Sequence, residues 1–425
     1  MRTSNIQHRT SNVESGMGGG AICEALERRV MFADGGTILF VRGATRSGGF
    51  LEGTTADSRN EQLADINNAS TSAGNAGWAA LAGELRGQGF AVEQITEPKE
   101  RTEDGSGVVA GRPIRFETMD LSNYSAIVFG SNNARYPKES VDAIESYIRG
   151  GGGALFISDA NFGSNWRDAA DSDQQFLARF GLIVNQDAAS GTTTLSRGGE
   201  DFVAGDHPVL KGVDSITGEG VSPVVIAQTL PAGVTIARVV AATGQTRNND
   251  GTSASNHFQG SLRPVTAQDA ALALVKAGGG RVAAFFDRNT FFNANGVGTD
   301  ITEADNRQLA RNLFSWVSDS TPPGVVSSSF VQGAPSEARI RFNDSLAGSL
   351  TRGDVLLRDP FDATPVPRKR WSFSVMEIDG ETELLIRIKG AQPAGTYQLQ
   401  INPGRISDDA GNVNVRRVRL NFMIV

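Results

Sequence analysis

The stretch GGGGALFISDAN, residues 150–161, decides the fold class of the larger part of the chain. Four glycines stop the preceding segment, four apolar residues follow, and small polar residues come directly after them. A short apolar run bounded in this way is typical of a strand buried on both faces of a parallel sheet. Ligands of such sheets bind beyond the carboxyl ends of the strands, so Ser158, Asp159 and Asn161 lie where chemistry is expected.

Apolar runs and amphipathic segments alternate on both sides of this stretch. Trp78, Leu81 and Leu85 fall at helical spacing, and Pro137 stands where a helix can begin without losing a hydrogen bond. We predict strands at residues 38–41, 90–92, 127–129 and 279–287, and helices near residues 78–85, 137–148 and 309–316. This alternation predicts an α/β domain over residues 35–319, with a parallel sheet covered by helices on both faces.

Two further predicted strands end in polar residues. Asn132 and Asn133 follow the run 127–129, while Asp287 and Asn293 close the run 279–287 and the segment after it. The last two could bind a ligand or equally fix the loop that follows the strand. The candidate ligand-binding residues are therefore Asn132, Asn133, Asp159, Asn161, Asp287 and Asn293.

Composition excludes several classes of function. The 425 residues are 39% hydrophobic and 20% charged, with a net charge of -7 from 40 basic and 47 acidic residues. No broad positive field for nucleic acid follows from that balance, and no apolar run is long enough to span a membrane. Cys23 is the only cysteine, which excludes an intramolecular disulfide and a cysteine-based metal cage. We expect no cofactor and no bound metal.

The last part of the chain has a different period. Beyond Thr321-Pro322-Pro323-Gly324, a natural linker, apolar residues alternate with polar ones, as at Ala338, Ile340 and Phe342. Short alternating runs separated by turn residues predict an all-β sandwich over residues 322–425. We expect the linker to separate two domains that fold independently.

The first 34 residues show no apolar periodicity and are expected to form a disordered leader. Within them, ALERRVMFAD at residues 25–34 resembles the LEPR-type sorting segment of exported planctomycete proteins, with Arg28 in place of the proline. That resemblance implies a secreted protein in an extracellular, periplasmic or cell-surface location. A helical N-terminal tail is the alternative.

The order of motifs in the α/β domain resembles the class I glutamine-amidotransferase superfamily, especially its trehalose-utilisation-like and GIFT-type branches. The segments that carry the resemblance are residues 124–132, 151–161, 206–213 and 279–287. It implies a flavodoxin-like sheet with a nucleophile elbow after residue 157. Residues 325–330, 395–397 and 409–412 resemble strands and a turn of bacterial Ig-like domains.

In the catalytic members of that superfamily the elbow carries a cysteine, whereas here it carries Ser158. Thiolate chemistry is therefore not available. Ser158 could act as a nucleophile only with a base beside it, either His207 or His257; otherwise it binds neighbouring backbone. A structural role is also the favoured interpretation of His207. Asp168, Asp171 and Asp173 could hold Ca²⁺, but they lack EF-hand spacing and are expected on a solvated surface.

These observations predict an exported cell-surface or envelope protein whose amidotransferase-like domain is a pseudoenzyme that binds a ligand or partner. The expected partner is a carbohydrate or an envelope protein. One alternative is a hydrolase or carbohydrate-processing enzyme that uses Ser158 and His207 in place of the lost thiol. The other is a purely structural envelope component. A contact between His207 and Ser158 would decide for the enzyme.

Overall fold

The structure is a computed structural model. It describes residues 36–42, 46–47, 63–72, 76–96, 99–101, 108–110, 113–130, 132, 136–158, 166–167, 169–185, 192–219, 222–242, 260–261, 263–294, 299–319, 321–346, 348–359, 364–378, 381–408, 410 and 412–425. The predicted leader and His257 lie outside these residues. Within the described ranges, no helix combines the length and the apolar character that crossing a bilayer requires.

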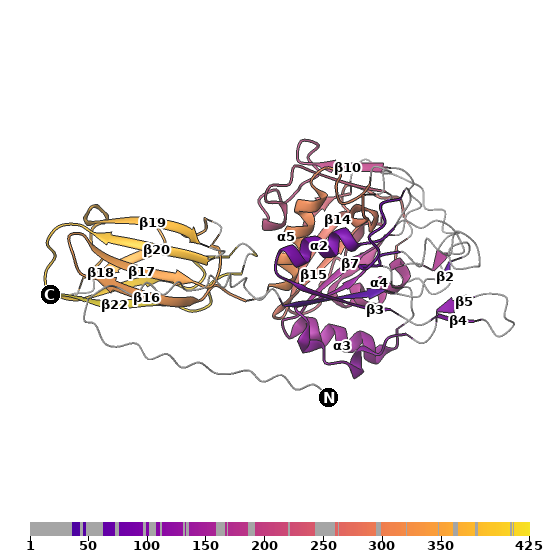
Figure 1. The fold of residues 1–425 in the computed structure, drawn as a ribbon, viewed down its shortest axis with the longest axis horizontal. Helices are drawn as coiled ribbons and strands as arrows, with labels where there is room; N and C mark the ends of the chain where they lie inside the picture. The colour runs from indigo at the N-terminus through magenta and orange to yellow at the C-terminus, as the bar shows by residue number, and fades with distance from the viewer. Residues whose placement is uncertain are drawn as a thin grey trace, which may run out of the picture. The chain divides into compact units, whose positions relative to one another are not determined.

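Five parallel strands form one side of the main sheet, from the edge strand β3 inward (Figure 1). Their order is β3-β1-β6-β7-β15, which in chain order is 2-1-3-4-5, the flavodoxin-like order. The strands are β1 (Thr37–Arg42), β3 (Ala91–Thr96), β6 (Ala126–Phe129), β7 (Gly153–Ile157) and β15 (Gly280–Phe285). The predicted parallel α/β sheet is confirmed, and four of its strands coincide with the apolar runs in the sequence.

Helices cover both faces of this sheet (Figure 1). Side chains alternate along a strand, so Ile38 and Phe40 of β1 face one core while Leu39 and Val41 face the other. The first core includes α2 (Ala79–Gly87) and α5 (Asn306–Ser318), and the second includes α3 (Lys138–Arg149) and α4 (Ala169–Leu177). Helices α2, α3 and α5 each contribute an apolar stripe at i, i+3 and i+4 spacing, whereas α4 contributes Phe176 and Leu177.

The sheet continues in antiparallel strands, which the sequence analysis did not predict. β14 forms a hairpin with β15, so the sheet is mixed rather than parallel throughout. The added strands are β9 (Leu182–Val184), β12 (Val224–Ile226), β13 (Val234–Ala241) and β14 (Ala270–Ala277). β14 is almost wholly buried and rich in alanine, so neither alternation nor β-propensity distinguishes it.

Glycines allow the helix ends to reach the starts of the strands. A Cβ on Gly153 would lie 2.0 Å from the carbonyl oxygen of Val317 in α5. A Cβ on Gly280 would lie 1.9 Å from the carbonyl oxygen of Ile148 in α3. Both distances are far below van der Waals contact, so only glycine fits at these crossings.

Shorter elements surround the main sheet. Three pairs of strands are antiparallel: β2 (Arg46–Ser47) with β8 (Trp166–Arg167), β4 (Lys99–Arg101) with β5 (Val108–Ala110), and β10 (Thr192–Ser196) with β11 (Ser215–Glu219). The 3₁₀ turns are η1 (Phe116–Thr118), η2 (Leu121–Asn123), η3 (Ala178–Phe180), η4 (Pro208–Leu210), η5 (Asn289–Phe291) and η6 (Arg368–Arg370).

Two antiparallel sheets form a β-sandwich in the last part of the chain. One is β16 (Val325–Val331), β17 (Ser336–Phe342), β20 (Glu381–Ile388) and β19 (Trp371–Ile378); the other is β18 (Val355–Arg358), β21 (Gly395–Ile401) and β22 (Val418–Ile424). Their inward residues build a core of their own, which includes Trp371 and Tyr397. The predicted all-β sandwich is confirmed, while its assignment as an Ig-like domain stays a prediction.

The linker between the two cores is hydrogen-bonded rather than free. Gly324 and Asn343 exchange two hydrogen bonds, of 2.6 Å to the Asn343 side chain and 3.0 Å to the Gly324 carbonyl. The amide of Asn412 donates to the carbonyl oxygens of Asp319 at 3.2 Å and Thr321 at 3.1 Å. The sandwich therefore holds the linker along its length.

Candidate ligand-binding site

The elbow residue Ser158 lies directly after β7, at the carboxyl edge of the sheet. Its backbone N–H donates to the carbonyl oxygen of Phe285 at 3.0 Å, which places it beside the end of β15. Its hydroxyl donates to Oδ2 of Asp173 on α4, also at 3.0 Å. Both side chains are buried. The helix that follows the elbow segment therefore supplies an acid as the partner of Ser158.

Asp173 is a neutral acid at pH 7. Complete burial raises its pKa to about 8, although the Ser158 hydroxyl, the nearby amide of Asn132 and the charge of Arg288 act in the opposite direction. Because Oδ2 accepts the Ser158 hydroxyl, the proton is expected on Oδ1. Within the described part of the chain, Oδ1 has no hydrogen-bond partner. Asp173 thus offers an unused hydrogen-bonding position.

The side chain of Asn132 offers two more unused hydrogen-bonding positions. It comes after β6, close enough to Asp173 to lower that pKa, and its side chain is wholly buried. Neither amide atom meets hydrogen-bond geometry with any described group. A buried polar atom without a partner costs about 1–3 kcal/mol, and such atoms are rare in native proteins. The carboxamide is therefore a group that a ligand or a water molecule must satisfy.

Further unsatisfied atoms follow the same edge of the sheet. Trp78 precedes α2, and its ring packs against the backbone of Gly130, directly after β6. Its indole N–H has no hydrogen-bond acceptor among the described residues, and the hydroxyls of Thr193 and Thr299 likewise have no partner there. Ligand sites of open α/β sheets lie at this edge. Several of the unsatisfied atoms thus lie on segments at the edge where the fold itself predicts binding.

Two predicted site residues turn out to hold loops in place. Asp287 is buried, and its Oδ1 accepts the N–H of Asn289 at 3.0 Å, which stabilises η5. The Asn293 side chain accepts the N–H of Ala80 at 2.8 Å and donates to the carbonyl oxygens of Asn68 and Ser70. Asn293 therefore joins the end of β15 to the start of α2. These contacts fit the loop-fixing interpretation, and ligand binding by Asp287 and Asn293 stays a prediction.

The sequence analysis missed Arg288 as a site residue and misjudged Asp173. Arg288 follows Asp287 at the end of β15, is buried, and acts electrostatically on Asp173. Asp173 was expected on a solvated surface, which is wrong. It lies on the same face of α4 as Phe176 and Leu177, at i, i+3 and i+4 spacing, and that pattern was a readable signal.

Several predicted residues cannot be placed. Asn133, Asp159, Asn161, His257 and Asp168 lie outside the described residues, and of Asp171 only the backbone, within α4, is described. The site as described therefore consists of Asn132, Ser158, Asp173 and Arg288.

His207 lies at the opposite edge of the sheet. It caps η4, where its Nδ1 accepts the N–H of Val209 at 3.3 Å, and its ring meets the edge of Trp316 near the end of α5. Burial, followed by the charges of Lys276 and Arg281, lowers its pKa to about 4. Arg281 begins the strand β15, whereas Ser158 pairs with its end. The structure therefore does not bring His207 and Ser158 together.

The fold and site thus define an α/β domain with a flavodoxin-like strand order and a buried polar site, followed by a β-sandwich. No protein-family model matches the sequence, and no curated protein matches it. Among solved structures, the chain is similar to a protein described as ThuA-like from Parabacteroides merdae ATCC 43184. The two share 14% sequence identity with a TM-score of 0.32, over 67% of this chain and 90% of that one.

Proposed function

We propose that this chain is an exported cell-surface or envelope protein whose α/β domain binds a polar ligand without transforming it. The observation that carries the proposal is Asn132, a wholly buried carboxamide with neither polar atom hydrogen-bonded to a described group. A protein retains such a costly group where binding satisfies it. Export is supported by the LEPR-like segment at residues 25–34.

The contacts of Ser158 argue against catalysis. A serine nucleophile needs a base that removes its proton as it attacks. Its hydrogen-bond partner is Asp173, and burial raises the pKa of that carboxyl group to about 8, so most of it is protonated at pH 7. His207 stands at the other edge of the sheet, bonded to the backbone of Val209. The pairing of Ser158 with His207 that the hydrolase alternative requires is therefore not formed.

The unsatisfied atoms describe the chemistry of the ligand. The amide of Asn132 offers donors on one atom and an acceptor on the other, while the protonated Oδ1 of Asp173 offers a donor. Hydroxyl groups donate and accept at once, so a polyhydroxylated ligand matches this set. Carbohydrate is accordingly the proposed ligand class, and an envelope protein that presents polar groups is the second candidate.

A binding experiment tests the proposal. Saturation-transfer NMR against a panel of neutral oligosaccharides should show contacts with the unaltered protein and none with Asn132→Ala. The control is Asn421→Ala, because Asn421 is exposed on β22 of the sandwich and its side-chain oxygen accepts a hydrogen bond from Gln398. Equal binding by Asn132→Ala and the unaltered protein would contradict the proposed site. No binding by any variant would favour the purely structural alternative.

A further inference from the structure

A buried arginine connects the α/β domain to the sandwich. Arg281, at the start of β15, donates to the carbonyl oxygen of Trp316 at 2.6 Å and stacks over its ring at 4.9 Å. Its second terminal nitrogen donates to the side-chain oxygen of Asn412 in the sandwich. Asn412 returns hydrogen bonds to the linker carbonyls of Asp319 and Thr321. We call these contacts the Arg281–Asn412 clasp.

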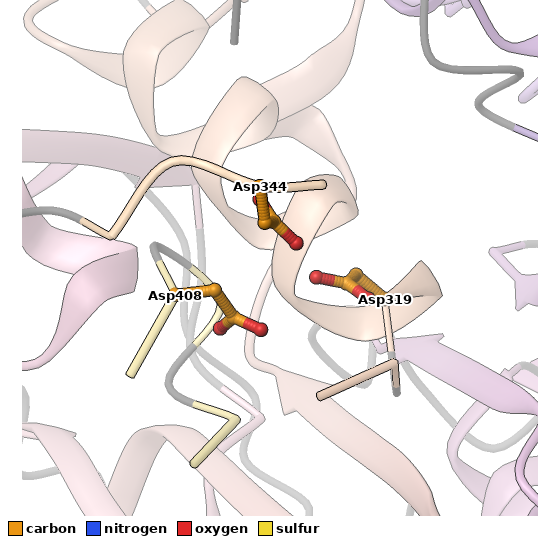
Figure 2. A group of neighbouring side chains, drawn as sticks. All are labelled: Asp319, Asp344 and Asp408. Atoms are coloured by element: carbon orange, nitrogen blue, oxygen red, sulfur yellow. The ribbon is translucent and has the colours of Figure 1, made fainter. Parts of the chain in front are cut away.

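Three carboxylates surround the clasp. Asp319 follows α5, Asp344 follows β17, and Asp408 lies in the loop between β21 and β22, so the two domains share the group. Their carboxylate oxygens lie within 4.8 Å of one another, and Figure 2 shows the side chains converging. Asp408 is tied to the clasp, since it accepts the backbone N–H of Asn412 at 2.7 Å and its side-chain amide at 2.9 Å.

The charges facing this group come from every element around it. Arg281 and Lys276 supply two positive charges from β15 and β14, against three negative ones. Arg197, Asp206 and Lys211 line the cleft beside Asp408 and add two positive charges and one negative charge. His207, from η4, adds none, since its pKa of about 4 keeps the imidazole neutral. The three carboxylates lie so close together that they repel one another when all are ionised, and binding one proton relieves that repulsion.

We propose that closure of the Arg281–Asn412 clasp is proton-linked, so that the sandwich docks more firmly on the α/β domain as the pH falls. The carboxyl group that takes up the proton is Asp408. It is the most buried of the three, and its carboxylate accepts two hydrogen bonds from Asn412. Asp344 belongs to the sandwich as Asp408 does, so docking brings the Asp408 carboxylate next to that of Asp319 and undocking separates the two.

The sign and size of the effect follow from linkage. Burial, with a smaller contribution from Asp319, raises the pKa of Asp408 to about 6, against an ordinary value near 4. A carboxyl group whose pKa is raised in the docked form binds its proton more tightly there, so docking weakens as the pH rises through about 6. For one proton, the ratio of docked to undocked molecules should fall by about tenfold between pH 5 and pH 8.

Fluorescence energy transfer across the clasp tests this. Dyes are attached to Gly83→Cys on α2 and Ser329→Cys on β16, two exposed positions, in a Cys23→Ser background. Transfer efficiency in the full chain should report a docked population that decreases between pH 5 and pH 8, with a midpoint near 6. Asp408→Asn should make the efficiency independent of pH over this range. Asp214→Asn, which alters a side chain that is 89% exposed, should behave as the unaltered protein.

A second variant covers the case in which Asp408→Asn fails to fold. Arg281 lowers the pKa of Asp408, so Arg281→Gln should move the midpoint to higher pH as well as reduce docking. Three results would each overturn the proposal: equal efficiency at pH 5 and pH 8 in the unaltered chain, an unchanged pH response in Asp408→Asn, or docking at pH 8 that needs Ca²⁺ and does not respond to acid.

Discussion

Replacing Asn132 with leucine should stabilise the protein while abolishing ligand binding. Leucine has the same number of side-chain heavy atoms as asparagine, so Asn132→Leu removes the polar atoms and nearly preserves the shape. Those two atoms are buried and lack partners among the described groups. Each such atom lowers the free energy of unfolding by about 1–3 kcal/mol, and replacing it with an apolar atom recovers a part of that cost. We therefore expect Asn132→Leu to raise the free energy of unfolding by about 1–2 kcal/mol.

The matched control is Asn306→Leu. Asn306 is equally buried, but its amide donates to the carbonyl oxygens of Thr217 at 2.9 Å and Asp300 at 2.8 Å, and its oxygen accepts the N–H of Thr217 at 2.9 Å. Leucine there would leave three buried backbone groups unpaired. Asn306→Leu should therefore destabilise the domain by about 3 kcal/mol or more.

Chemical denaturation of both variants and the unaltered chain, at pH 7 without ligand, measures the two effects. Thermal unfolding provides a second estimate, at roughly 2–4 °C per kcal/mol for a domain of this size. The reasoning fails if Asn132→Leu destabilises the domain by as much as Asn306→Leu does. That result would mean that bound water or the protein itself satisfies the carboxamide.

Three further predictions concern the same domain. The folded form binds a proton on Asp173 that the unfolded form releases, because the pKa of Asp173 is raised to about 8. The free energy of unfolding should therefore fall by up to about 1.4 kcal/mol per pH unit between about pH 4 and 8. Asp173→Asn should remove this slope, which denaturation at pH 5, 6, 7 and 8 measures. Ser158→Ala should cost roughly 1 kcal/mol, and a serine-reactive phosphonate should leave the unaltered protein unlabelled by mass spectrometry; labelling that Ser158→Ala abolishes would establish a hydrolase. Gly280→Ala should prevent stable folding, because its Cβ would lie 1.9 Å from a carbonyl oxygen. Gly83→Ala, with open space around its Cβ, should raise the free energy of unfolding by about 0.5–1 kcal/mol. Thermal melts followed by circular dichroism distinguish the two variants.

The sequence revealed the parallel part of the sheet because those strands are buried on both faces. Short continuous apolar runs, such as residues 38–41 and 154–157, indicate strands that are buried on both faces. β14 is equally buried, yet its alanines and its position in a hairpin resemble neither a parallel strand nor an alternating one. The antiparallel extension was missed for that reason.

The candidate site was only partly readable. Strand ends identified Asn132 and Ser158, because a polar residue after a buried strand stands out in the sequence. The acid that bonds Ser158 comes from a helix, and only the spacing of Asp173 with Phe176 and Leu177 could have placed it on the buried face. No pattern in the sequence could show that His207 lies at the other edge of the sheet, since that depends on how residues 192–219 pack against it.

β15 links the two proposals and also separates them. Its first residues carry Arg281, which bonds to Asn412 of the sandwich, while its end adjoins Ser158 and leads into Arg288 beside Asp173. Docking of the sandwich therefore occupies the amino edge of the sheet, and the carboxyl edge with its unsatisfied polar atoms stays clear of those contacts. Since the two sets of residues share no side chain, Asp408→Asn should leave ligand affinity unchanged and Asn132→Leu should leave the pH response of docking unchanged. A change in either would mean that β15 transmits an effect between its ends, so that ligand binding and domain docking are coupled.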